Sequence, residues 1–545
     1  MSTNEQSGSA APMRPAVVVP RTMEEVLSAL PRHLAAVHHV SGAPDGGAQP
    51  TITGLTMDSR QVRPGDLYVA VPGTGRHGAD FTAQAVAAGA AAVLTDDAGT
   101  ALAAPALSGS GLPLYRASPV RDYVGPLASI VFDSQPADGR PILFGVTGTN
   151  GKTTTTYFVN ALAAALGKST GLIGTIEIRA GETVIPSILT TPESPEVHGI
   201  LALMRERGVD AAAMEVSSHA IEYRRVDGVR FDVAGFTNLT QDHLDLHGSM
   251  EEYFAAKAAL FRPERTERAV VIIDDSWGRR LAAEAGVPTL TLSVAGAAEA
   301  DWTVREVRRD GLGNTFTLAG PGGAQLALRC GLPGNFNVAN AALAAVMILA
   351  SGFGIADVQR AVDEHDPFTT QVPGRMQLIG ESPAAIVDFA HNPDALALTL
   401  DSVRIEDSDS RVLVVFGATG QRDVSKRPVM GATAARRADV VIITDDDPHD
   451  EDEAGIRAGV LQGARAARDA EGLDCEILEV FPRAEAINRA VSLARRQDVV
   501  LIAGRGHEVW QEVKGVNLPL DDRVELAAAL TRHGFSVRSG NRIES

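Results

Sequence analysis

Gly-Val-Thr-Gly-Thr-Asn-Gly-Lys-Thr-Thr-Thr-Thr, residues 145–156, is the stretch that decides the fold. The apolar run Ile142–Phe144 before it predicts a buried strand, and the alanine- and leucine-rich run Tyr157–Leu166 after it predicts a helix. A strand, a glycine-rich turn and the start of a helix together form a phosphate-binding arrangement. The glycines let backbone N–H groups approach the anion, and the helix dipole favours negative charge at its N-terminus.

Within this turn, Lys152 is placed to reach the terminal phosphates of a nucleotide, and the Thr153 hydroxyl to ligate magnesium. One position departs from the general motif, because Val146 stands where a glycine is usual. A glycine- and threonine-rich turn without a ligand is therefore an alternative, but a lysine followed by four threonines favours nucleotide binding. The residues expected to contact ATP are Gly148, Thr149, Asn150, Gly151, Lys152, Thr153 and Thr154.

The composition predicts a soluble globular protein of several domains. The 545 residues are too many for one core, and hydrophobic and charged residues make up 45% and 21%. The net charge of −19 argues against nucleic acid as a partner, since phosphate backbones require basic surfaces. Two distant cysteines, Cys330 and Cys475, suit a reducing cytosol. No apolar run is long enough to span a bilayer, so we expect a cytoplasmic protein without a membrane partner.

Turn signals and changes in composition divide the chain into four parts. Residues 1–20 are polar and rich in Ser, Ala and Pro, and we expect a disordered tail. Residues 21–136 form a small N-terminal α/β domain, and the segment 134–140 is a linker. Residues 137–366 form a central doubly wound domain, because apolar strands alternate there with helices. Residues 367–545 form a Rossmann-like C-terminal domain.

Polar residues follow two strands of the central domain. Glu215 follows the apolar run Ala211–Met214, and a cluster that includes His243 follows Val233–Phe236. The carboxylate and the imidazole would both reach magnesium at the phosphates. The alternative is that residues of these clusters cap helices.

Two further features point to ligands. Asn337 and Asn340 share one face of a later helix, where they either hold a base edge or cap the helix. In the third domain, four strands end in polar clusters that begin at Asp388, Gly417, Asp445 and Gly504. Ligands bind at the carboxyl ends of such strands. We therefore expect a second binding face that meets the phosphate loop across a cleft.

Taken together and in order, these motifs resemble those of the Mur ligase family. The Thr190-Thr191-Pro192 segment and the Asp-x-Pro loop at Asp446 are most similar to its UDP-N-acetylmuramoyl-tripeptide synthetases. The matching segments cover nearly the whole chain: Thr147–Thr154, Glu215–His219, Thr237–Asp245, Gly334–Asn340, Pro373–Arg375, Asp388–Pro393 and Gly504–Glu508.

The resemblance implies a three-domain ligase that uses ATP and Mg²⁺ in peptidoglycan synthesis. The first domain would bind the UDP end of UDP-N-acetylmuramoyl-L-alanyl-D-glutamate, the second ATP, and the third the incoming diamino acid. The free D-glutamate carboxylate would become an acyl phosphate, which the α-amine attacks. Positioning and electrostatics would dominate, without a protein nucleophile. We expect a monomer.

The resemblance also implies roles for individual residues. Lys257 matches a lysine that becomes carbamylated (N6-carboxylysine) and holds a second magnesium, since a carbamate has the oxygen ligands that magnesium requires. With Thr153, Glu215 and His243 it would complete the metal site, and with Lys152, Glu215 and His243 the catalytic set. Contacts to the UDP-substrate match Met57, Ser59, Thr74, Thr190, Thr191, Ser217 and Arg225. Further contacts to ATP match Asn337, Arg375 and Asp388. Contacts to the amino acid match Arg422, Asp446, His449, Gly504 and Glu508.

Two positions depart from the family pattern. Leu189 stands where the family often has asparagine before Thr190. Family members that add meso-2,6-diaminopimelate typically have the sequence Asp-Asn-Pro-Arg in the amino-acid loop. This chain has Asp446-Asp447-Pro448-His449 at that place. A neutral histidine clamps a carboxylate poorly, and the carboxylates nearby (Asp445, Asp447, Asp450 and Glu451) favour an ammonium. We therefore predict L-lysine as the added amino acid.

Several alternatives stay open at this point. Diaminopimelate is the rival amino acid, with a protonated His449 or Arg505 as the cation, and a loop that faces water would select nothing. A folylpolyglutamate-synthetase-like ligase would not need the segment Met57–Arg60. A nucleotide-binding regulator would hydrolyse ATP without an acceptor. A non-catalytic scaffold is disfavoured by the intact Lys152 and Glu215.

Overall fold

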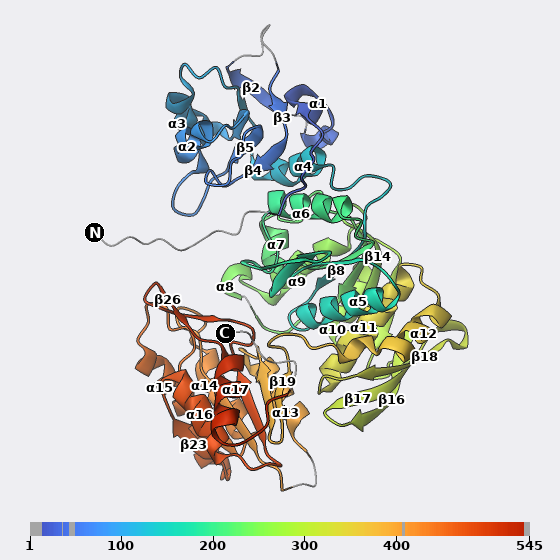
Figure 1. Ribbon diagram of the computed structural model, residues 1–545, viewed down its shortest axis with the longest axis vertical. Helices are drawn as coiled ribbons and strands as arrows, with labels where there is room; N and C mark the ends of the chain where they lie inside the picture. Colours follow the sequence, from blue (N-terminus) through green and yellow to red (C-terminus); the bar gives the residue numbers. More distant parts are fainter. Residues whose placement is uncertain (1–12, 35, 43–48, 243, 406–408, 539–545) are drawn as a thin grey trace.

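The computed structural model describes residues 13–34, 36–42, 49–242, 244–405 and 409–538. Figure 1 shows three α/β units along the long axis of the molecule, with the first unit above the central one and the third below it. Each unit is built on its own sheet. The three-domain α/β architecture expected from the sequence is confirmed.

The first unit has a five-stranded sheet in the order β2-β7-β6-β5-β4. Its strands β4 to β7 run parallel, and β2 pairs antiparallel with β7. The strands are β2 (His38–Ser41), β4 (Gly54–Thr56), β5 (Asp66–Ala70), β6 (Ala92–Thr95) and β7 (Leu114–Arg116), with β1 (Arg21–Thr22) and β3 (Thr51–Ile52) paired separately. The helices are α1 (Met23–Ser28), α2 (Thr82–Ala87), α3 (Asp97–Leu107) and α4 (Arg121–Phe132).

The central unit has an eleven-stranded sheet in the order β11-β10-β9-β12-β8-β13-β14-β15-β16-β17-β18. The strands from β9 to β16 in that order run parallel, and the outer hairpins are antiparallel. The strands are β8 (Ile142–Thr147), β9 (Thr170–Ile173), β10 (Glu177–Ala180), β11 (Thr183–Pro186), β12 (Ala211–Glu215), β13 (Phe231–Phe236), β14 (Thr266–Ile272), β15 (Thr289–Ser293), β16 (Trp302–Asp310), β17 (Gly313–Ala319) and β18 (Gln325–Cys330). The helices are α5 (Lys152–Ala165), α6 (Ser194–Glu206), α7 (Ser218–Glu222), α8 (Leu244–His247), α9 (Met250–Ala258), α10 (Ser276–Glu284), α11 (Asn335–Ala350) and α12 (Ile355–His365).

Strand β8 is buried on both of its faces, which explains its continuous apolar run. Phe144 and Val146 belong to the apolar cluster under α5 and α11, whereas Leu143 belongs to the cluster on the opposite face of the sheet. The helix after the turn begins at Lys152 and not at Tyr157. The prediction placed its start too late because threonine disfavours helix interiors, but here Thr153–Thr156 are buried and packed.

The third unit has a six-stranded sheet in the order β19-β20-β24-β21-β22-β23, parallel except for β19. The strands are β19 (Gln377–Glu381), β20 (Ala384–Asp388), β21 (Val412–Phe416), β22 (Val440–Ile443), β23 (Glu476–Glu479) and β24 (Val499–Ala503), with a separate hairpin of β25 (Trp510–Val513) and β26 (Val516–Pro519). The helices are α13 (Pro393–Val403), α14 (Lys426–Ala435), α15 (Glu453–Glu471), α16 (Arg483–Leu493) and α17 (Asp522–Arg532).

The disordered tail expected over residues 1–20 is too long. Residues 1–12 lie outside the described part of the chain, but Met13 is buried and Arg14 forms an ion pair with Asp66. The prediction was wrong for residues 13–20 because composition does not report contacts with distant parts of the chain. In the described ranges, no helix has the length and apolarity needed to cross a membrane.

The junction between the first two units gives a test of this packing. Gly125 lies inside α4, where a change to alanine ordinarily stabilises a helix by roughly 1 kcal/mol. A Cβ at this position would lie 2.2 Å from the carbonyl oxygen of Asp227, which belongs to the central unit. We therefore expect Gly125→Ala to lower the midpoint of thermal unfolding, because backbone must move to accept the methyl group.

Gly459 provides the matched control for this variant. It lies inside α15, where an added Cβ meets only side-chain carbons of Arg427, at 3.5 and 3.6 Å. We expect Gly459→Ala to raise the free energy of unfolding by about 0.5–1 kcal/mol. Calorimetric unfolding of both variants measures the difference, and a rise of the midpoint in both would contradict the packing described for Gly125.

Candidate active site

The phosphate loop connects the end of β8 to the start of α5. Gly151 has φ of 91°, a left-handed conformation that glycine adopts without strain, and a Cβ there would lie 2.4 Å from Oδ1 of Asn340. The loop is held from the end of β13, where Thr237 Oγ1 donates to the carbonyl oxygen of Asn150 at 2.7 Å. Asn150 N donates to Oδ1 of Asn238 at 3.1 Å. The cluster after β13 therefore supports the backbone of the loop.

Lys152 lies over its own loop. Its Nζ donates to the carbonyl oxygens of Gly148 and Thr149, at 3.0 and 2.9 Å. Burial lowers the pKa of Lys152, while Glu215 and Asp242 act in the opposite direction. The Thr149 hydroxyl lies 3.3 Å from the Tyr253 hydroxyl, and Thr154 is buried in the first turn of α5.

Glu215 lies beside the loop because β12 and β8 are parallel neighbours, with Glu215 opposite Val146. Its Oε2 accepts a hydrogen bond from Thr153 Oγ1 at 2.9 Å, and its Oε1 accepts one from Thr175 N at 2.7 Å. A hydroxyl and a carboxylate at this spacing are oxygen ligands of the kind that Mg²⁺ prefers. The residues present therefore fit a magnesium ion at the terminal phosphates.

The metal site proposed from the sequence has a further ligand, His243. His243 lies outside the described residues. Where side chains are described, no group of three or more His, Cys, Asp or Glu residues is arranged to hold a metal. Oxygen ligands from outside the described protein residues would have to complete the coordination that Thr153 and Glu215 begin.

Lys257 does not lie on a solvated helix face. It is 1% exposed, and its Nζ donates to the carbonyl oxygen of Gly148 at 2.7 Å. Burial, and then the charge of Lys152, lower the pKa of Lys257 well below its ordinary value. Burial and the neighbouring Lys152 therefore both favour the uncharged form of this amine beside the phosphate loop.

Asn337 and Asn340 lie behind the phosphate loop. Asn337 is buried, its Nδ2 donates to the carbonyl oxygen of Pro333, and its Oδ1 accepts from Asn340 Nδ2 at 3.1 Å. Asn340 Oδ1 in turn accepts from Thr155 Oγ1 at 3.2 Å. The sequence left open whether this pair contacts a base edge or caps the helix. Because the two side chains connect α11 to α5, they give no support to contact with a base edge.

Arg375 and Asp388 bring the third unit to the phosphate loop. The Arg375 guanidinium lies 4.1 Å from the ring centroid of Phe389. Burial lowers its pKa, with Asp388 and then Glu215 opposing, and Arg375 itself lowers the pKa of Lys152. Charged groups of the central and third units therefore lie close enough to affect each other's pKa values. Asp388 accepts from the backbone N–H of Met376 at 2.7 Å, so it holds the turn that carries Arg375.

A cavity of about 690 Å³ lies between the first and central units. Met57 and Ser59 line it from the first unit, and Leu189 from the central one. Ser59 Oγ donates to Gln84 Oε1 at 2.9 Å. Thr74 is exposed and is not part of this lining, although its neighbours Gly73 and Arg76 are. The loop that contains Thr74 therefore contributes Gly73 and Arg76 to the cavity wall, and not Thr74, the residue that the family pattern implies.

The remaining substrate candidates lie between this cavity and Glu215. Thr191 is buried and donates to the carbonyl oxygen of Glu215 at 2.8 Å. Its hydroxyl lies 3.5 Å from Ser217 Oγ, and its carbonyl oxygen accepts from Arg225 at 3.3 Å. The Thr190 hydroxyl oxygen lies 3.1 Å from Thr175 Oγ1, to which it can donate while Thr175 donates to Glu215. A chain of hydrogen bonds thus leads from Thr153 through Glu215 and Thr175 to Thr190.

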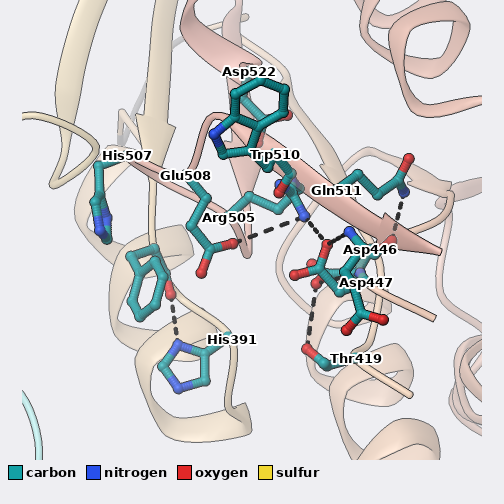
Figure 2. A network of polar contacts seen from close by, with 12 residues as sticks. His391, Thr419, Asp446, Asp447, Arg505, His507, Glu508, Trp510, Gln511 and Asp522 are labelled. Atoms are coloured by element: carbon teal, nitrogen blue, oxygen red, sulfur yellow. Dashed lines mark hydrogen bonds and ion pairs between the residues drawn. The ribbon is translucent and has the colours of Figure 1, made fainter. Parts of the chain in front are cut away.

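In the third unit, the structure brings Asp446, Gly504 and Glu508 together at the carboxyl ends of β22 and β24 (Figure 2). A Cβ at Gly504 would lie 2.7 Å from Oδ2 of Asp446. Burial opposes ionisation of Asp446, but Arg483 and Arg505 hold its pKa below the ordinary value. Burial raises the pKa of Glu508 to about 8, and Asp446 adds to the rise. Arg422, in contrast, lies exposed.

The acidic loop after β22 is not a free negative surface. Arg457 pairs with Asp445, Arg505 pairs with Asp447, and Arg427 makes two contacts with Glu451, at 2.6 and 2.8 Å. The charge argument for an ammonium at this loop is therefore wrong for three of its four carboxylates, because the arginines come from distant parts of the chain.

The hairpin β25–β26 was not anticipated as part of this pocket. Glu512 N donates to Asp447 Oδ1 at 3.1 Å, Gln511 Nε2 donates to the carbonyl oxygen of Asp446 at 2.5 Å, and Glu512 pairs with the His449 ring. Figure 2 shows the same hairpin above Arg505. Sequence reasoning also missed Thr175, although this residue follows the carboxyl end of β9, and Glu215 lies at the carboxyl end of the neighbouring strand β12.

Fold and site together define a class, a protein of three α/β units with a phosphate loop in the central unit and a cavity between the central unit and the first. The Mur ligase middle domain matches residues 146–348, and the Mur ligase, glutamate ligase domain matches residues 374–506. The Mur ligase family, catalytic domain matches residues 51–128. The chain belongs to the Mur ligase family, and it is an ATP-dependent ligase.

Individual relatives agree with this assignment. A Streptomyces coelicolor protein named UDP-N-acetylmuramoyl-L-alanyl-D-glutamate–2,6-diaminopimelate ligase is 46% identical over 493 residues, covering 90% of this chain and 94% of that protein. A Leifsonia xyli protein named UDP-N-acetylmuramyl-tripeptide synthetase is 45% identical, covering 89% and 92%. A solved structure titled as a UDP-N-acetylmuramoyl-L-alanyl-D-glutamate–2,6-diaminopimelate ligase matches with a TM-score of 0.63 and 29% identity, covering 95% of this chain and all of that one.

The raised pKa of Glu508 predicts how stability depends on pH. Between its ordinary value of 4.5 and about 8, the folded protein keeps the proton on Glu508 and the unfolded chain releases it. Unfolding therefore releases a proton in this window, and the stability that Glu508 contributes is lost as the pH rises through it. We expect Glu508→Gln to weaken that loss, so that the variant gains stability relative to the original chain between about pH 5 and about pH 8.

Thermal unfolding midpoints of both proteins across that pH range provide the measurement. Glu476 is exposed on β23, and Glu476→Gln serves as the control that changes the same chemical group outside the pocket. Parallel pH profiles for the original chain and Glu508→Gln would show that the Glu508 carboxyl titrates normally in the fold.

Proposed function

We propose that this chain joins a diamino acid to the D-glutamate of UDP-N-acetylmuramoyl-L-alanyl-D-glutamate in peptidoglycan synthesis. One observation carries the proposal. The hydrogen-bond chain Thr153–Glu215–Thr175–Thr190, at 2.9, 3.0 and 3.1 Å, runs from the phosphate loop to the residue that follows Leu189 of the cavity lining. A sugar-peptide bound in that cavity would end where a terminal phosphate is held. The names of the relatives support the same reaction.

The chain's own residues suit an acyl-phosphate mechanism. The D-glutamate carboxylate would attack the terminal phosphorus of ATP, and ADP would leave. Lys152 would turn from Gly148 and Thr149 toward the phosphates, and Thr153 and Glu215 would hold the magnesium ion. That ion neutralises charge on the transferring group. The incoming amine then attacks the acyl carbon through a tetrahedral intermediate, and phosphate leaves with its bonding electron pair.

Lys257 supports the carbamate that the family pattern implies. A neutral amine is the form that attacks carbon dioxide, forming an N–C bond and releasing one proton. The lowered pKa of Lys257 supplies that form beside Gly148. The carbamate would replace a repulsion between Lys257 and Lys152 by an attraction. Its oxygens would also suit a second magnesium ion.

The names of two of the relatives favour 2,6-diaminopimelate as the added amino acid, in preference to L-lysine. The pairing of the loop carboxylates with Arg427, Arg457 and Arg505 supports the same choice, since paired carboxylates repel an anionic end of the substrate less. L-Lysine is the second candidate on one observation. His449 replaces the arginine of the Asp-Asn-Pro-Arg pattern, and its ring is engaged by Glu512.

A panel of amino acids tests the proposal and decides between the two candidates. The purified protein is incubated with ATP, Mg²⁺, the UDP-linked dipeptide and either meso-2,6-diaminopimelate, L-lysine or L-ornithine, and phosphate release and product mass are followed. We expect product with the dipeptide acceptor only, and faster turnover with diaminopimelate. Faster turnover with L-lysine would reverse the choice of amino acid and leave the ligase reaction standing.

Lys152→Ala is the matched control for the panel. Loss of its charge at the transferring phosphoryl group should slow product formation by about 100-fold or more with every amino acid. For the unchanged protein, phosphate release without any acceptor would instead indicate an ATPase. Phosphate release that requires a dihydropteroate acceptor would indicate a folylpolyglutamate-type ligase.

The carbamate on Lys257 has its own test. Protein equilibrated with ¹³C-bicarbonate should give a carbamate carbonyl signal in the NMR spectrum that Lys257→Arg lacks, because a guanidinium stays charged. The same variant should lose activity by about 100-fold, since it adds a cation where an oxygen ligand is needed. A fully active Lys257→Arg protein would rule out the carbamate as a metal ligand.

A further inference from the structure

The two-domain cavity depends on how the first unit is placed. Its lining comes from both sides, with Met57 and Gln84 from the first unit and Ile185 and Glu196 from the central one. A rotation between the units would open or close it. Whatever holds the units in register therefore controls binding of the UDP-substrate, an inference that rests on the function proposed above.

Residues 13–17, which we call the strap, lie in the seam between the two units. Met13 is buried in the apolar cluster of the central unit, and it also lines the cavity. One residue later, Arg14 pairs with Asp66 of the first unit at 2.8 Å and donates to the carbonyl oxygen of Leu55 at 3.3 Å. The backbone N–H groups of residues 16 and 17 then donate to Glu206 of α6, at 2.9 and 3.1 Å. Five residues thus contact both units in alternation.

The surfaces on both sides leave room for the strap. Strand β4 is the edge of the first sheet, and Arg14 covers it where Gly54 has no side chain. On α6, the three atoms nearest to a Cβ at Gly199 would all belong to the strap, namely the carbonyl oxygen of Met13 at 3.2 Å and two carbons of Arg14. Gly199 therefore makes room for the strap, and Gly54 makes room for the Arg14–Asp66 pair.

The Arg14–Asp66 pair is better shielded than the other ion pairs across this junction. Its side chains are 7% and 3% exposed. Among the other ion pairs that join the first and central units, the side chains of Arg224 and Asp122 are 43% and 23% exposed. In a second such pair, those of Arg205 and Asp133 are 30% and 48% exposed. Exposed pairs contribute little, whereas a shielded pair holds its partners in one geometry and is costly to break.

We propose that the strap sets the position of the first unit against α6, and that Arg14 and Met13 are positioning residues for the UDP-substrate. Met13 adds one apolar side chain to the cavity wall, and Arg14 keeps the chain in the seam. The strap touches neither the phosphate loop nor the amino-acid pocket through the contacts described here, so its effect should be confined to one of the three substrates.

Steady-state kinetics with the full chain test this division. Arg14→Ala should raise KM for the UDP-linked dipeptide by about tenfold or more, while kcat and KM for ATP change by less than about twofold. Arg14→Lys should restore part of the affinity, because it keeps a cation near Asp66. Arg116→Ala is the control, since it removes an exposed arginine paired with Asp97 in the same unit.

Gly199→Leu tests the strap without changing any of its groups. The new side chain would grow from α6 into Met13 and Arg14, and leucine favours the helix more than glycine does. We expect the same selective rise in KM, and a broader distribution of intramolecular distances in small-angle X-ray scattering for Gly199→Leu and Arg14→Ala.

Scattering needs no substrate, so it separates this inference from the proposed function. Broadened distances in both variants support the strap even where the UDP-linked dipeptide proves not to be the acceptor. Folded variants that keep the compact scattering profile and an unchanged KM for the UDP-linked dipeptide would overturn it, as would an equal loss of affinity for ATP.

Discussion

The parallel pairing of β8 with β12 is the constraint on which the rest of the site depends. Because Glu215 lies opposite Val146, its carboxylate reaches Thr153 in the first turn of α5 and Thr175 after β9. A shift of one residue in this register would turn Glu215 to the other face of the sheet. The contact between the strand end and the helix start therefore places a carboxylate suited to a metal ion at the phosphate loop.

Around this contact the protein gathers positive charge that it does not fully neutralise. Lys152, Lys257 and Arg375 are all buried enough for desolvation to lower their pKa values; Arg375 lowers the pKa of Lys152 further, and Lys152 that of Lys257. Such an arrangement is unfavourable for the isolated fold and favourable for an anionic ligand. Two of these residues belong to the central unit and one to the third, so an anion bound between them would draw the two units together.

The residues at the strand ends of the third unit follow a different principle, in which opposite charges are matched inside the protein. Arginines from α14, α15 and the end of β24 pair with the carboxylates of the loop after β22. The hairpin β25–β26 closes over the same loop through Gln511 and Glu512. Glu508 shares Arg505 with Asp447, lying 3.8 Å from its guanidinium, while burial and Asp446 raise the pKa of Glu508 to about 8.

By itself, the sequence determined the elements whose signals are local. The apolar run before Gly145, the glycines of the turn and the polar residue after each strand identify the phosphate loop, Glu215 and the edges where ligands bind. These follow from strand periodicity and helix dipoles, which need only neighbouring residues. Tertiary structure decided what depends on distant partners: the burial of Lys257 and Asn337, the exposure of Thr74, the pairing of Asp447 with Arg505, and the packing of Met13 between two units. Charge and burial at a residue are set by whatever the fold brings against it, and no local pattern records that.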